Sequence, residues 1–178
     1  MKKSLKSIIN NIGIKNQNIS NDINVTGISM NSKLIDEGNI FVAIKGLSSD
    51  GHDFIDQAIN SGASAIVTNG CDLGPLSVPQ IKVDDTRKAL SAIAAEYYGR
   101  PSNDLVVIGI TGTNGKTTTA ALTKAILDSA GHKTAQIGTL GLIADGIDHE
   151  KTMTTPDAIS IQKILHNLRE KSFTHVVM

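Results

Sequence analysis

The fold is decided by the stretch Leu105-Val106-Val107-Ile108-Gly109-Ile110-Thr111-Gly112-Thr113-Asn114-Gly115-Lys116-Thr117-Thr118, which lies past the middle of the 178-residue chain. Its first half is a continuous apolar run, which predicts a central parallel strand covered on both faces. A glycine-rich loop follows, and residues 117–129 are rich in alanine and leucine, as in a helix that ends near Gly131. With a further strand expected over 134–139, this pattern predicts an α/β unit built on a parallel sheet.

The loop itself has the composition of a phosphate cradle. Gly112 and Gly115 leave room for backbone amides to turn toward phosphate oxygens, and the helix start adds unsatisfied amides and a positive dipole end. Lys116 would supply a mobile positive charge, and the Thr117 hydroxyl a magnesium ligand. The standard phosphate-loop pattern has glycine where this chain has Ile110, so the motif is the shorter Gly-x-x-Gly-Lys-Thr. The alternative interpretation is a glycine turn followed by a solvated lysine.

A second α/β segment precedes this unit. Apolar runs alternate with helical patterns there, and Asp85 is a plausible N-cap for the last helix. The predicted strands are 40–44, 65–67 and 81–83, and the predicted helices are 54–61 and 85–98. The polar, turn-forming run 99–104 then predicts a domain boundary, which gives a first domain over 1–103 and a second over 104–178.

The C-terminal part contains one more helix signal. Thr155, Pro156 and Asp157 are typical of an N-cap, a first helical residue and an early acid, and they predict a helix over 157–170. Residues 175–178 then have the pattern of a strand that has only begun. Because a parallel sheet is not expected to stop at a new strand, we interpret the second domain as incomplete.

Composition limits the classes of function. Seventeen basic and 17 acidic side chains balance, and aromatic residues make up 3%, so neither a nucleic-acid nor an anionic membrane surface is expected. Cys71 is the sole cysteine, which excludes an internal disulfide and favours a reducing compartment. Without a signal peptide or a continuous apolar span in the sequence, we expect a cytoplasmic protein.

The loop Ile110–Thr118 resembles the ATP loop of the Mur ligases, the amino-acid-adding enzymes of peptidoglycan synthesis, which is shared with folylpolyglutamate synthetase relatives. Further similarity narrows the choice to the third-residue ligases, the MurE type. It lies in the stretches 38–43, 50–55, 137–141 and 154–157. The resemblance implies a small N-terminal uridine-nucleotide-binding domain, followed by the first part of a P-loop ATPase domain, with the family's C-terminal domain absent.

The implied activity is that of an ATP-dependent ligase. It would add diaminopimelate or lysine to UDP-N-acetylmuramoyl-L-alanyl-D-glutamate through an acyl phosphate, with ATP and Mg²⁺ as cofactors. The ATP-binding residues would be Gly112, Thr113, Asn114, Gly115, Lys116, Thr117 and Thr118, with Lys116 catalytic and Thr117 on the metal. The substrate-binding residues would be Ser32, Leu47, Ser48 and Ser49 for the UDP part, and Thr154 and Thr155 for the muramoyl-peptide part. Without the resemblance, Ser32 is a loop serine and Thr155 a helix cap.

The family places a magnesium-binding glutamate, a carbamylated lysine and the amino-acid-selecting domain beyond Met178. The chain alone is therefore expected to be inactive, and the full-length protein to be a monomer. One departure from the family stands at Asn31-Ser32-Lys33, where Asp-Ser-Arg is common, because lysine cannot reproduce a planar two-pronged arginine contact. Two alternatives remain open: a nucleotide-binding module without ligase activity, and a P-loop kinase or GTPase-type switch.

Overall fold

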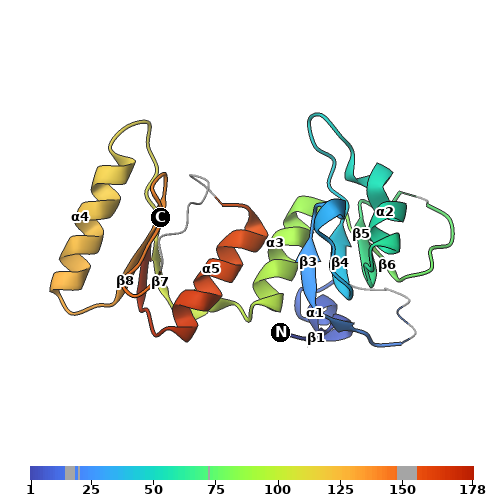
Figure 1. Cartoon of the computed structure of the whole chain (residues 1–178), viewed down its shortest axis with the longest axis horizontal. Helices are drawn as coiled ribbons and strands as arrows, with labels where there is room; N and C mark the ends of the chain where they lie inside the picture. The colour runs from blue at the N-terminus through green and yellow to red at the C-terminus, as the bar shows by residue number, and fades with distance from the viewer. Residues whose placement is uncertain (15–18, 20, 72, 148–155) are drawn as a thin grey trace. The chain divides into compact units, whose positions relative to one another are not determined.

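The computed structural model describes residues 1–14, 19, 21–71, 73–147 and 156–178 (Figure 1). They form two compact units, Met1–Tyr97 and Tyr98–Met178, and each is described by itself. The sequence places its boundary slightly later, between residues 103 and 104. Among the described residues, none of the helices combines the length and apolar character needed to cross a membrane.

Unit 1 is built on a four-stranded parallel sheet. Its strands lie in the order β3 (Gly27–Ser29), β4 (Asn39–Val42), β5 (Ala65–Thr68) and β6 (Gln80–Lys82). A separate antiparallel pair joins β1 (Lys3–Ser4) to β2 (Asn24–Val25). The predicted strands 40–44, 65–67 and 81–83 are confirmed as β4, β5 and β6, whereas β3 was not predicted.

Helices cover both faces of this sheet, as α2 and α3 show in Figure 1. The helices are α1 (Leu5–Asn11), α2 (Ile55–Asn60) and α3 (Thr86–Tyr97), with short 3₁₀ helices η1 (Ser32–Leu34) and η2 (Gly51–Phe54). On the α2 face, Ile55 and Ala58 pack in one core with Phe41 and Ile66. The predicted cap of α3 is confirmed, since the Asp85 carboxylate accepts from the Arg87 and Lys88 amides at 2.9 and 3.0 Å.

Unit 2 contains a mixed sheet in the order β7 (Val106–Ile108), β10 (His175–Val177), β8 (Thr134–Gly138) and β9 (Gly141–Ile143). The last strand, β10, is parallel to both of its neighbours, with Val176 opposite Val107 on one side and Ala135 on the other. β9 turns back antiparallel to β8. The predicted strands are confirmed as β7, β8 and β10, while β9 was not predicted.

The two long helices of unit 2 lie on opposite faces of its sheet (Figure 1). They are α4 (Lys116–Ser129) and α5 (Ala158–Glu170), and η3 (Pro101–Asn103) precedes β7. The α5 face is a dense core in which Leu168 and Val176 are fully buried. On the α4 face packing is looser, because Ala120 is the one buried residue among the described residues of α4.

The prediction that β7 is a central strand covered on both faces is wrong. Within the described part of the chain β7 is an edge strand, and Val106 and Val107 are 53% and 38% exposed. The reason is the strand order: β10 pairs with one side of β7, while α4 packs mainly on β8 and β10. An apolar run shows that a strand can be buried, but it does not determine the position of that strand in the sheet.

The predicted cap of α5 also needs correction. Asp157 is the N-cap, and its Oδ1 accepts from the amides of Ile159 and Ser160 at 2.9 Å each. Pro156 therefore precedes the cap instead of opening the helix, and Thr155 lies outside the described residues. An aspartate that reaches two free amides of the first turn is a stronger cap than a threonine placed two residues earlier.

Replacing Asp157 with alanine is expected to destabilise unit 2 by about 1 kcal/mol, because two first-turn amides lose their acceptor. Asp157→Asn serves as the control, since asparagine is an equally good cap. Urea unfolding of the two variants would measure the difference, and equal stability of Asp157→Ala and the unmodified chain would contradict the assignment of this cap.

Candidate functional site

The glycine-rich loop connects the carboxyl end of β7 to the start of α4, at the sheet edge where open α/β folds bind ligands. Gly112 and Gly115 have φ angles of 154° and 79°, which L side chains rarely adopt. Gly115 is also the N-cap residue of α4. The two glycines singled out from the sequence are therefore the positions at which the backbone requires glycine.

Lys116 is the first residue of α4, and its side chain folds back over the loop. Its Nζ donates to the carbonyl oxygens of Gly112 at 2.7 Å and Thr113 at 3.4 Å. The ammonium group is thus held where the loop curves, and the two carbonyls are weaker partners for it than a phosphate would be. A bound polyphosphate could take over this charge without a change in the backbone.

The start of α4 leaves backbone donors available. The Thr119 amide makes the first helical bond, to the Gly115 carbonyl at 2.8 Å, so the preceding amides have no carbonyl acceptor within the helix. Among the described residues, no side chain caps this helix, and its first turn, which includes Thr117 and Thr118, carries no acid. Free amides and an uncompensated helix dipole together make an anion site.

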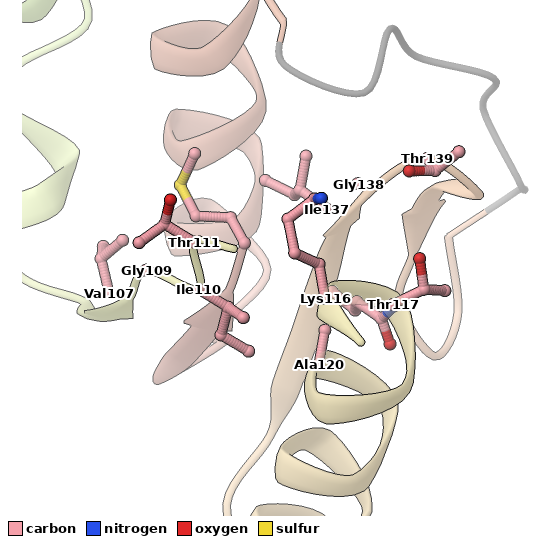
Figure 2. A pocket seen from close by; sticks show the side chains of 12 residues that line it. Val107, Gly109, Ile110, Thr111, Lys116, Thr117, Ala120, Ile137, Gly138 and Thr139 are labelled. Carbon is pink, nitrogen blue, oxygen red and sulfur yellow. The ribbon is translucent and has the colours of Figure 1, made fainter. Parts of the chain in front are cut away.

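A pocket of about 440 Å³ opens beside the loop. Figure 2 shows the side chains around it, which come from β7 and the loop, from the start of α4 and from the end of β8. Lys116 and Thr117 line it together with Gly138 and Thr139, and most of the remaining lining is apolar. A largely apolar wall with few polar groups is typical of ligand pockets.

Gln136 is a residue of this pocket that the sequence analysis missed. It lies on β8, is only 3% exposed and lines the pocket, whereas its neighbours Ala135 and Ile137 belong to the α5 core, and Ile137 also borders the pocket. The signal was present in the alternation of the strand, because a polar residue between two core positions must face the opposite side of the sheet.

In unit 1, Ser32 follows β3 and opens η1. Its side chain is buried, and Oγ donates to Gln57 Oε1 of α2 at 2.9 Å. Asn31 caps η1 by accepting from the Lys33 amide at 3.0 Å. The Ser32 hydroxyl is thus fixed by a neighbour and retains acceptor capacity toward a ligand.

The predicted residues Leu47, Ser48 and Ser49 are in an exposed turn after β4. A bridge between Lys45 and Asp50 closes this turn, and the Gly46 amide donates to the Ser49 carbonyl at 2.9 Å. Because β3 and β4 are parallel neighbours, the turn and Ser32 lie at the same carboxyl edge of the sheet. The structure thus brings these four predicted residues to one edge, while Thr154 and Thr155 lie outside the described residues.

His52 connects this turn to the next strand. Its Nδ1 lies 2.6 Å from Asp50 Oδ1, and its Nε2 accepts from the Asn69 amide at 3.5 Å. Hydrogen bonds from the amide and the ring of His52 lower the pKa of the Asp50 carboxyl. Over the described ranges, no three His, Cys, Asp or Glu side chains gather in a metal-binding group.

By its geometry, unit 2 is an α/β unit of the phosphate-loop class. The two halves of the chain each match a family description: residues 24–98 match the Mur ligase family, catalytic domain, and residues 110–178 match the Mur ligase middle domain. The chain belongs to the Mur ligase family.

Individual relatives are consistent with this assignment. The chain is 42% identical, over 98% of its length, to the UDP-N-acetylmuramoyl-L-alanyl-D-glutamate--2,6-diaminopimelate ligase of Syntrophomonas wolfei. A solved structure of a ligase with that name aligns with 99% of the chain at a TM-score of 0.76 and 25% identity. MurF ligase from Thermotoga maritima in complex with ADP aligns with 84% of the chain at a TM-score of 0.55 and 27% identity. The chain spans 36%, 36% and 30% of these three proteins, respectively.

Proposed function

We propose that this chain supplies the uridine-nucleotide site and the ATP loop of a cytoplasmic ligase of peptidoglycan precursor synthesis. The ligase would join the third amino acid, which is 2,6-diaminopimelate in the name of the Syntrophomonas wolfei relative, to UDP-N-acetylmuramoyl-L-alanyl-D-glutamate. The observation that carries the proposal is the loop geometry around Lys116, in a chain 42% identical to such a ligase. The ADP complex of the Thermotoga maritima relative supports ATP as the phosphoryl donor.

In this proposal unit 2 positions ATP. The amides at the start of α4 donate to phosphate oxygens, and Lys116 moves from the Gly112 carbonyl to the outer phosphates. These residues neutralise charge while the phosphoryl group passes to the substrate carboxylate, which forms an acyl phosphate for the amine of the amino acid to attack. The chain contributes positioning and electrostatics and makes no covalent bond of its own.

The residues present fit a magnesium ion at the same place. Thr117 lines the pocket beside Lys116 and offers a hydroxyl oxygen, which together with phosphate oxygens matches the oxygen ligands that Mg²⁺ prefers. When bound, Mg²⁺ would add positive charge at the phosphates. Thr117 would hold it from the first turn of α4, and Lys116 would remain free to follow the transferred group.

Unit 1 would hold the uridine nucleotide at the carboxyl edge of its sheet. Ser32 is fixed there by Gln57, and the turn with Leu47, Ser48 and Ser49 presents exposed side chains at the same edge. Separate sites for the two nucleotides explain why the chain has two α/β units. A site at this edge follows the general rule for parallel sheets.

Calorimetric titration of the chain with UDP-N-acetylmuramoyl-L-alanyl-D-glutamate tests the proposal. We expect saturable binding of this nucleotide and of ATP with Mg²⁺. The number of molecules bound of each should be the same whether or not the other is present. UDP-glucose is the control for recognition of the muramoyl-dipeptide part. Binding of ATP or GTP without any binding of the UDP-linked dipeptide would contradict the ligase assignment and favour a module or switch.

A further inference from the structure

We propose that His52 is a positioning residue of the uridine-nucleotide site, which clamps the turn 45–50 to the carboxyl end of β5. The inference rests on the proposed function, because the turn contains the candidate contacts Leu47, Ser48 and Ser49. His52 itself is not proposed to touch the ligand, and its role is to hold the turn in place.

The turn has little to fix it besides its two ends. Leu47 is fully exposed at its tip, and the residues from Lys45 to Ser49 are all exposed. Its first end is held by Arg87, whose Nη2 donates to the Lys45 carbonyl at 3.1 Å. Its second end is Asp50, whose carboxylate contacts the His52 ring. A turn with so few buried contacts is expected to fluctuate unless its ends are fixed.

The ring of His52 uses both nitrogens. The Asp50 carboxylate can only accept, so Nδ1 carries the proton and donates to it at 2.6 Å. Nε2 is therefore the free acceptor, and the Asn69 amide donates to it at 3.5 Å. Since Asn69 directly follows β5, the ring joins the end of the turn to the neighbouring strand.

Close packing around the ring restricts the orientations that the His52 side chain can adopt. The His52 side chain is only 12% exposed. The preceding residue, Gly51, donates its amide to the Ile44 carbonyl at 2.9 Å, and a Cβ on Gly51 would lie 2.6 Å from the Ile44 nitrogen. The backbone at Gly51, directly before His52, therefore packs closely against the backbone at Ile44. Without the Asn69 contact, the described contacts of the turn with the rest of unit 1 would be the Arg87–Lys45 bond and the Gly51–Ile44 bond.

Three substitutions separate the two contacts of the ring. In His52→Gln, the terminal amide oxygen reaches the place of Nε2 and can accept from the Asn69 amide. In His52→Asn, the terminal nitrogen stands at the place of Nδ1 and can donate to Asp50, but nothing reaches Asn69. His52→Ala removes both contacts. Asp53→Ala, on the same 3₁₀ helix and exposed, is the matched control.

The experiment combines hydrogen exchange with nucleotide binding. In the ligand-free chain, His52→Ala and His52→Asn should speed exchange at the Asn69 and Gly51 amides, and His52→Gln should not. For UDP-N-acetylmuramoyl-L-alanyl-D-glutamate, we expect His52→Ala and His52→Asn to raise Kd roughly tenfold, and His52→Gln to stay within about threefold of the unmodified chain. ATP affinity and the melting temperature of the Gln variant should not change.

The outcomes distinguish a failure of the proposed function from a failure of the role of His52. If the unmodified chain does not bind the UDP-linked dipeptide, the proposed function fails, and with it the role of His52 in that site. If the unmodified chain binds it and His52→Ala binds it equally well, only the role of His52 is overturned. Exchange rates that are the same in His52→Gln and His52→Ala would also overturn it, because they would show that the Asn69 contact does not hold the turn.

Discussion

Replacing Lys116 with alanine is expected to weaken ATP binding roughly 100-fold, since charge-assisted hydrogen bonds to phosphate are among the strongest polar contacts in proteins. The fold should survive, because within the described residues the Lys116 ammonium bonds to two loop carbonyls at an exposed part of the chain. Isothermal titration with ATP and Mg²⁺ would measure the affinity, and circular dichroism would check the fold.

Lys163→Ala is the matched control for this prediction. Lys163 is an exposed lysine of α5 that does not line the pocket, so its loss changes the net charge by the same amount. We expect ATP affinity to stay near that of the unmodified chain in this variant. An affinity in Lys116→Ala equal to that of Lys163→Ala would mean that the loop lysine does not contact phosphate, and the ATP site would have to be sought elsewhere.

Leu168→Ala is expected to destabilise unit 2 by about 3 kcal/mol, because it removes a buried side chain and leaves a cavity. Leu168 lies on α5, is fully buried and packs in one core with Ile137 and Val176. Urea unfolding would measure the loss of free energy of unfolding, monitored by far-ultraviolet circular dichroism.

Leu122→Ala makes the same chemical change on α4, where the leucine is 61% exposed. Its expected cost is within about 0.5 kcal/mol, as for other surface substitutions. The pair therefore tests whether the loss at Leu168 comes from its burial and not from the change of leucine to alanine in a helix. Similar losses for both substitutions would contradict the structure, because they would show that the burial of Leu168 does not set its contribution.

The phosphate loop could be predicted from the sequence because its signals are local. Gly112 and Gly115 occupy backbone conformations that favour glycine, and Lys116 follows at the first helical position. An apolar run before them and an alanine-rich stretch after them fix the flanking elements. The helices α3 and α4 were predictable for the same reason, since each carries its cap or its terminating glycine in its own sequence.

The strand order could not be predicted, because it depends on contacts between distant segments. The run Val106–Ile108 has the composition of a buried strand, yet β10 takes the central place and leaves β7 at the edge. The strands β3, Gly-Ile-Ser, and β9, Gly-Leu-Ile, each begin with glycine, which is depleted in strands and weakens so short a signal. At the site, the Ser32–Gln57 and His52–Asn69 contacts were hidden for the same reason, since each joins residues far apart in the chain.

The central position of β10 has a consequence for the order in which the protein folds. Synthesis releases the chain from its N-terminus, so all strands of the unit 1 sheet exist once Lys82 has emerged. The sheet of unit 2 instead needs its last strand, His175–Val177, to join β7 to β8. Pairing β10 with β7 joins segments that are far apart in the chain, and such non-local pairing slows folding. We therefore expect unit 1 to fold during translation, while the edges of β7 and β8 that pair with β10 stay open to association between nascent chains until β10 is inserted.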